Sequence, residues 1–395
     1  GLVMSASRGA WLALGAAALI SLVWTGSGWL SQSALRQRLR LFAGILALTL
    51  LIAAGVLILW RSYPAAWQNN LLSLDTWHNR REFQSRSATL VRDYPFIGSG
   101  LGGFEMLYST YVMLIHVGFI TNSHNLFLSI AIDQGLPALL SLIAMWVLFA
   151  VITWRTVVVR RFSGERIDPD PSPLGVAVLS LIVALAHGMV ESTLYGSGVV
   201  LLFFPLAYAV KARGRPSKVH MRLGVAALLI CLCIPLALML LQPRRALSLT
   251  YSNLGSIHQS QAELSVYQWP EWVLQDEVRD SVNLDKVIGE FEQALAWDPW
   301  NATANRRLAM IELAQGRYQE ALRHLKLAYA VEPENMTTRQ LLGEALIVNG
   351  RETEGRAQWQ GLSNDQEQFQ IRAFWYEYIG DEERAEWIRQ AAERP

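Results

Sequence analysis

Residues 80–135 read RREFQSRSATLVRDYPFIGSGLGGFEMLYSTYVMLIHVGFITNSHNLFLSIAIDQG and separate two apolar segments of the chain. The stretch has a glycine-rich turn at residues 98–103 and ends in Ser123-His124-Asn125-Leu126, where the next apolar run begins. Guanidinium groups bind phosphate with paired hydrogen bonds, so an arginine-rich loop beside a membrane indicates an anionic ligand. The arginines of this loop are Arg80, Arg81, Arg86 and Arg92.

The composition is that of a membrane protein with a soluble part. Of the 395 residues, 52% are hydrophobic and only 17% are charged, which is too apolar for a soluble chain of this length. The net charge of +1 hides an asymmetry, because arginine dominates residues 1–245 whereas Glu and Asp dominate the remainder. Cys231 and Cys233 lie two apart in an apolar run, where helical side chains diverge. We interpret them as packing residues, and not as a disulfide or a metal pair.

Apolar runs predict about six membrane spans within residues 1–245. The short basic loops between them are expected on the cytoplasmic side, which places the loop at residues 61–124 and everything after Pro243 outside. The chain begins without an initiator Met, and we expect it to be part of a longer protein. The predicted spans lie at residues 12–24, 41–60, 126–149, 174–210 (a hairpin of two short helices) and 223–241.

A repeat with a period of 34 residues fills the end of the chain. This period is typical of tetratricopeptide repeats, so residues 246–395 are predicted to form an α-solenoid outside the membrane. The concave surface of such a solenoid favours docking of a peptide or protein, and the alternative is a cap that only shields the membrane domain. A third, compressed unit follows at residues 374–385. The recurring pairs are Ala294 and Ala328, Pro299 and Pro333, Asn301 and Asn335, Leu308 and Leu342, Leu313 and Ile347, Gly316 and Gly350, and Glu320 and Glu354.

The external arginines have two interpretations. Each one alone fits an interfacial residue whose side chain extends to the lipid headgroups. A cluster of them favours a second function, because a pyrophosphate held at the outer membrane surface requires several arginines that converge from different segments.

The order of the motifs resembles the O-antigen ligase and polymerase superfamily of lipid-linked glycan transferases. The resemblance implies an all-α fold, a polytopic transmembrane helix bundle with a large external loop. It also implies that Arg8 and Arg80, or Arg86 in place of Arg80, bind the pyrophosphate of an undecaprenyl-linked glycan. The family has more spans than this chain, so further N-terminal helices are expected. The motifs are Ser7-Arg8-Gly9, Asp93-Tyr94-Pro95-Phe96-Ile97-Gly98, Ser123-His124-Asn125 and Asp133-Gln134-Gly135.

His124 is the candidate catalytic base. A sugar hydroxyl is a poor nucleophile at neutral pH and needs a general base, which imidazole supplies. Taken alone, a histidine between two capping residues at a helix start is usually an interfacial residue, but the motif context favours catalysis. Asp133 lies further along the same predicted helix, about 13 Å away by helical rise. We therefore assign Asp133 a structural role.

His187 and Glu191 share one helix face within an apolar segment, at positions i and i+4. Ionisable groups inside a membrane are functional candidates, but two residues are too few for a metal site. A structural hydrogen-bonded pair is therefore preferred, and the sequence predicts no metal and no cofactor.

The predicted function is transfer of a glycan from a polyprenyl-pyrophosphate donor to an acceptor hydroxyl at the outer face of a bacterial cytoplasmic membrane. His124 would act as the base, and Arg8, Arg80 and Arg86 would bind the pyrophosphate. The expected partners are the lipid-linked glycan, an acceptor lipid or glycan, membrane lipids and a protein bound in the repeat groove, without nucleic acid. The motifs do not distinguish a ligase from a polymerase, because the two differ in their acceptor. The alternative is a non-catalytic membrane scaffold for envelope or polysaccharide assembly.

Overall fold

The computed structural model describes residues 74–115, 120–162, 240–267, 273–362 and 366–393, with scattered positions between 181 and 237. The chain divides into two compact units. One comprises residues 1–83, 124–127 and 143–227, and the other comprises residues 84–123, 128–142 and 228–395. Arg8, the cysteines and the predicted spans at 12–24 and 41–60 lie outside the described residues, as does most of the two later predicted spans.

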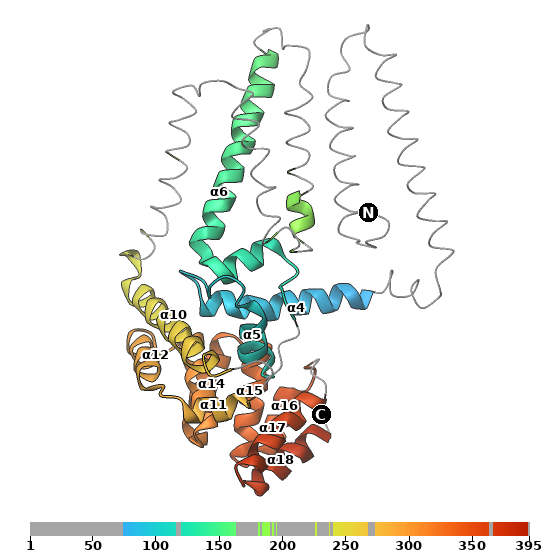
Figure 1. The fold of residues 1–395 in the computed structure, drawn as a ribbon, viewed down its shortest axis with the longest axis vertical. Helices are drawn as coiled ribbons and strands as arrows, with labels where there is room; N and C mark the ends of the chain where they lie inside the picture. Colours follow the sequence, from blue (N-terminus) through green and yellow to red (C-terminus); the bar gives the residue numbers. More distant parts are fainter. Residues whose placement is uncertain are drawn as a thin grey trace, which may run out of the picture. The chain divides into compact units, whose positions relative to one another are not determined.

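Every regular element in the described part of the chain is helical, which confirms the all-α prediction there (Figure 1). Helix α4 covers Leu74–Asp93, and a glycine-rich turn leads from it into α5 at Phe104–Tyr108 and a π-helical turn at Ser109–Met113. Helix α6 covers Leu126–Phe162. Within it, Leu126–Val147 is the one described segment that is long and apolar enough to cross a membrane, with a mean hydropathy of 1.8.

Helix α6 is broken at Gly135, whose backbone lies at φ 82° and ψ 170°. The sequence predicted one continuous helix from residue 126 to 149, and that prediction was wrong at this point. A residue other than glycine rarely adopts this conformation. Pro137 then lies in the first turn after the break. Backbone N–H groups in the first turn of a helix have no helical partner, so a proline there costs no hydrogen bond. Asp133 therefore sits at the end of a short first helical segment.

The glycine-rich turn is bound to this break through the backbone. Ser99 N donates to Ile132 O at 2.8 Å, and Gly100 N donates to Asp133 O at 3.1 Å. The Asp133 carboxylate accepts a hydrogen bond from Gly102 N at 3.3 Å. The turn thus satisfies carbonyls at the end of the first helical segment. The structural role assigned to Asp133 agrees with these contacts.

Gly98 cannot carry a side chain at this interface. It adopts φ 70°, and a Cβ atom on it would lie 2.3 Å from Asp133 O. We expect Gly98→Ala to lower the free energy of unfolding by about 2–4 kcal/mol, because left-handed strain adds to a backbone clash. Thermal or denaturant unfolding of the purified protein measures the change.

Gly100→Ala is the matched control for this experiment. Gly100 has φ 95° and also requires a left-handed backbone, but no atom lies within 4 Å of the position that a Cβ atom would take there. We expect this variant to lose only about 1–2 kcal/mol from backbone strain. Equal losses for the two variants would contradict the close packing of the turn against the helix break.

The C-terminal part of the chain consists of paired helices (Figure 1). Strong packing joins α10 to α12, α13 to α14, α15 to α16 and α17 to α18. This pairing is the tetratricopeptide arrangement that the period of 34 residues predicted. The helices are α10 Pro243–Leu264, α11 Gln275–Ser281, α12 Asp285–Trp297, α13 Ala302–Ala314, α14 Tyr318–Val331, α15 Met336–Val348, α16 Glu352–Trp359, α17 Gln366–Tyr378 and α18 Glu382–Glu393.

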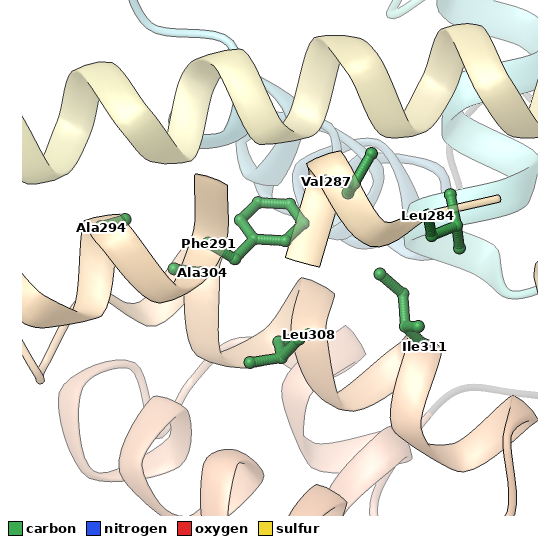
Figure 2. Close-up of a cluster of buried hydrophobic side chains, with 7 residues drawn as sticks. All are labelled: Leu284, Val287, Phe291, Ala294, Ala304, Leu308 and Ile311. Atoms are coloured by element: carbon green, nitrogen blue, oxygen red, sulfur yellow. The ribbon is translucent and has the colours of Figure 1, made fainter. Parts of the chain in front are cut away.

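Equivalent repeat positions have equivalent structural roles. Asn301 and Asn335 are N-caps, and their side chains accept hydrogen bonds from the backbone N–H three residues later, at 2.9 and 3.1 Å. Gly316 and Gly350 follow the ends of α13 and α15, and their backbone φ angles are 73° and 75°. An apolar cluster between α12 and α13 joins the first helix pair to the second (Figure 2). It consists of Leu284, Val287, Phe291, Ala294, Ala304, Leu308 and Ile311.

Helix α13 is buried around its whole circumference, although it contains several polar and charged residues. A surface helix normally buries one apolar stripe and exposes its polar residues. The polar side of α13 must therefore be covered by another polar segment. That segment is the loop that follows α4.

Candidate functional site

A buried ion cluster joins the end of α4 to α13. Asp93 is fully buried, and both Arg306 and Arg307 are fully buried beside it. Arg307 Nε donates to one carboxylate oxygen of Asp93 at 2.9 Å, while Arg306 donates to the other. Thr303 Oγ1 adds a third side-chain hydrogen bond at 3.1 Å. One carboxylate thus pairs with two buried guanidinium groups.

Two loop tyrosines extend this cluster. Arg307 donates to the hydroxyl of Tyr94 at 3.2 Å, and its guanidinium group lies 3.5 Å from the ring centre of Tyr111. Such a stacked cation and aromatic ring attract each other strongly when both are desolvated. The Tyr111 hydroxyl donates to Glu263 of α10 at 2.9 Å, and Arg279 of α11 donates to the same carboxylate at 3.3 Å. The cluster therefore joins the loop to four helices, α4, α10, α11 and α13.

The protonation states follow from burial and charge. Burial disfavours the charged form of Asp93, but the charges and hydrogen bonds of Arg306 and Arg307 outweigh it and hold the pKa below its ordinary value. Burial, together with the nearby Glu263 charge, raises the pKa of Tyr111 well above its ordinary value. At neutral pH the aspartate is ionised and the tyrosine is a hydrogen-bond donor.

Further contacts fix the rest of the loop on the repeats. Thr337 Oγ1 of α15 donates to Val112 O at 2.9 Å, and Gln275 of α11 donates to Ile115 O. At the surface, Arg92 pairs with Glu332 at 3.1 Å. Residues 92–115 therefore occupy the face formed by α10, α11, α13 and α15. On this face the repeats hold the chain's own loop.

A second buried cluster ties the last repeat to the others. Arg372 of α17 donates to Glu344 of α15 at 2.7 and 2.8 Å and pairs with Asp276 of α11. The Tyr376 hydroxyl donates to Glu344 at 2.8 Å. The compressed third repeat is thus held to α11 and α15 by charge as well as by apolar packing.

The sequence analysis did not find the contact between loop and repeats. Asp93 was interpreted as part of a family motif, and Arg306 and Arg307 were not singled out. A signal was present, because two adjacent arginines in a helix that the repeat pattern packs between other helices need a buried acidic partner. The sequence could not identify Asp93 as that partner, because the two segments are more than 200 residues apart.

His124 lies directly before α6 in an unusual backbone conformation. Its φ is 50°, which is uncommon for a residue with a side chain, and its half-buried ring lies 5.8 Å from the ring of Phe83. The neighbouring Asn125 accepts a hydrogen bond from Phe127 N at 3.0 Å, so its predicted capping role is confirmed. Strained residues of this kind cluster at functional sites.

The predicted arginines are placed only in part. Arg80 and Arg86 lie six residues apart on α4. Arg86 is buried, with 6% of its surface exposed, whereas the side chain of Arg80 and the whole of Arg8 lie outside the described residues. Arg86 and His124 belong to different compact units, so their grouping into one site stays a prediction. Glu191, the proposed partner of His187, also lies outside the described residues.

No group of three or more His, Cys, Asp and Glu side chains within the described ranges is arranged to hold a metal ion.

Two protein families match parts of the chain. Residues 1–143 match the family described as O-antigen ligase, and residues 312–373 match the family described as tetratricopeptide repeat. A search of curated proteins found no match. The first match includes α4, the glycine-rich turn and His124, and the second lies within α13 to α17. Both resemblances inferred from the sequence motifs are confirmed.

Proposed function

Because the chain carries an O-antigen ligase domain at residues 1–143 and a tetratricopeptide repeat at residues 312–373, we propose that it transfers a glycan from a polyprenyl-pyrophosphate donor to an acceptor hydroxyl. The observation that carries this proposal is the first match, which includes the arginine-bearing helix α4 and His124 in one segment. The reaction takes place at the outer face of the bacterial cytoplasmic membrane.

In the proposed reaction, the acceptor hydroxyl attacks the anomeric carbon of the donor sugar. His124 takes the hydroxyl proton as the new glycosidic bond forms, and the bond from the anomeric carbon to the pyrophosphate oxygen breaks. The leaving polyprenyl pyrophosphate keeps the electron pair of that bond. Arg8, Arg80 and Arg86 neutralise its charge with bidentate hydrogen bonds.

The contacts between the loop and the repeats support the proposed topology. Two segments that touch through buried side chains lie on the same side of any membrane that the chain crosses. Asp93 and Arg307 touch in this way, so an even number of crossings separates Ile115 from Pro243. Four spans are predicted in this interval, at residues 126–149, 174–210 and 223–241. The contacts place the loop and the repeats on one side of the membrane, and the basic short loops between the predicted spans are the reason to propose that this side is the extracytoplasmic one.

From the same contacts we infer an indirect role of the repeats in the proposed reaction. They hold residues 92–115, which follow the arginine-bearing helix α4, in one fixed conformation. The repeats thus hold the segment that directly follows the proposed donor-binding helix α4. Docking of a second protein would use surfaces of the repeats other than the face that the loop occupies.

The test is a transfer assay with the full-length protein, a purified lipid-linked glycan donor and an acceptor. We expect Arg80→Lys and Arg86→Lys to weaken donor binding nearly as much as the alanine variants, by about 10- to 100-fold, because an ammonium group cannot reproduce the guanidinium fork. Arg81→Lys is the control on the same helix, since Arg81 is exposed and outside the proposed site. Full tolerance of lysine at Arg8, Arg80 and Arg86 would reject the pyrophosphate site.

The tetratricopeptide match also favours a second candidate function, a membrane-anchored scaffold for polysaccharide assembly. A scaffold would bind glycan-assembly proteins but would transfer no glycan in the purified assay. The same experiment therefore separates the two functions.

A further inference from the structure

The glycine-rich turn exposes two large apolar side chains. Ile97 is 65% exposed and Leu101 is 78% exposed, the highest value among the large apolar side chains of the described residues. An exposed apolar side chain is common in proteins, but Ile97 and Leu101 lie four residues apart on one short turn, and a contiguous exposed apolar patch marks an interaction site.

The exposure is not a sign of a loose loop. Ser99 and Gly100 donate backbone hydrogen bonds to Ile132 and Asp133, and Leu136 N donates to Pro95 O at 2.9 Å. These bonds flank both apolar residues. The turn therefore presents Ile97 and Leu101 in a fixed conformation.

The patch continues onto α6. Leu136 and Leu140, which follow the helix break, are 39% and 44% exposed and lie four residues apart, so they share one helix face. By contrast, Ile130 and Ile132 before the break are buried. The apolar exposed surface thus starts at the turn and runs into the segment Leu126–Val147, the candidate membrane span.

We propose that the tip of the glycine-rich turn inserts into the membrane, with Ile97 and Leu101 among the acyl chains of the leaflet on the loop's side. The occupant is a lipid bilayer, because the patch is continuous with the exposed face of a helix that is apolar enough to lie within one. The first segment of α6 then packs within the protein, and the membrane-embedded part begins near Leu136 and continues along α6 beyond Val147, because a span needs about 20 residues. This inference does not depend on glycan transfer.

A fluorescence experiment on the full chain tests the insertion. In a variant with Cys231→Ala and Cys233→Ala, a single Leu101→Cys substitution carries an environment-sensitive NBD label, and the protein is placed in phosphatidylcholine nanodiscs. We expect a blue-shifted emission and strong quenching when doxyl-labelled lipids are included. An Ile97→Cys variant should behave in the same way.

The control is Ile379→Cys directly after α17, an apolar residue that is 42% exposed and outside the face of the repeats that the loop occupies. The emission of its label should be that of NBD in water, and doxyl-labelled lipids should not quench it. The proposal is overturned by either of two results at Leu101. Emission as in water would show a solvent-exposed tip, and blue-shifted emission without quenching would show a tip covered by protein.

Discussion

Replacing Asp93 with alanine is expected to lower the free energy of unfolding by about 3–5 kcal/mol. The substitution leaves Arg306 and Arg307 buried without their shared carboxylate, and an uncompensated buried charge is far more costly than a lost surface contact. The loop should also separate from α13 before the repeats unfold. Denaturant unfolding, with limited proteolysis of residues 84–115, measures both effects.

Arg92→Ala is the matched control for this prediction. Arg92 is the preceding residue and also bridges α4 to the repeats, but its side chain is half exposed and its pair with Glu332 lies at the surface. We expect this variant to lose less than about 1 kcal/mol. Similar losses for the Asp93 and Arg92 variants would show that the buried cluster is not what holds the loop.

The stability that Asp93 contributes should depend on pH. Its folded pKa lies below the ordinary value of 3.8, so its contribution is fully present above that value and is lost as the pH falls through the folded pKa. The difference in unfolding free energy between the wild type and Asp93→Asn should therefore narrow only in strong acid.

Replacing His124 with alanine is expected to reduce glycan transfer by about 10²- to 10⁴-fold, the usual contribution of a general base. Donor binding should stay nearly unchanged, because the arginines and not the imidazole hold the pyrophosphate. Single-turnover rates and a separate donor-binding measurement distinguish the two effects.

His258→Ala supplies the control for His124. His258 is also a partly buried histidine, but it lies on α10, pairs with Glu290 at 2.7 Å and has no part in the proposed reaction. We expect transfer by this variant to match the wild type. Full activity of His124→Ala would remove the proposed base and leave this histidine a residue of the membrane interface.

Local patterns predicted the local structure well. The period of 34 residues placed Asn301 and Asn335 at the same position of successive repeats, and both are N-caps, because capping depends only on the next three residues. The start of α6 after Asn125 was predicted for the same reason. The break at Gly135 was missed, although Pro137 lies two residues later, because the apolar run continues without interruption.

These local patterns did not predict long-range contacts. Nothing near Asp93 in the sequence points to Arg307, since the two residues meet only after the repeats have stacked. The same limit applies to the proposed catalytic site. The motifs identify His124 and the arginines as residue types suited to the reaction, but the distances between them depend on how spans far apart in the chain pack.

The partnership of Asp93 with α13 also has a consequence for biogenesis. More than 200 residues separate the two segments, so at 5–20 residues per second the ribosome needs roughly 10–40 s to make Arg307 after Asp93. During that interval the aspartate and the two tyrosines of the loop lack their final neighbours. The loop can reach its final conformation only after α10 to α15 have been made. A chain that terminates early therefore leaves this loop without its partners and open to proteolysis.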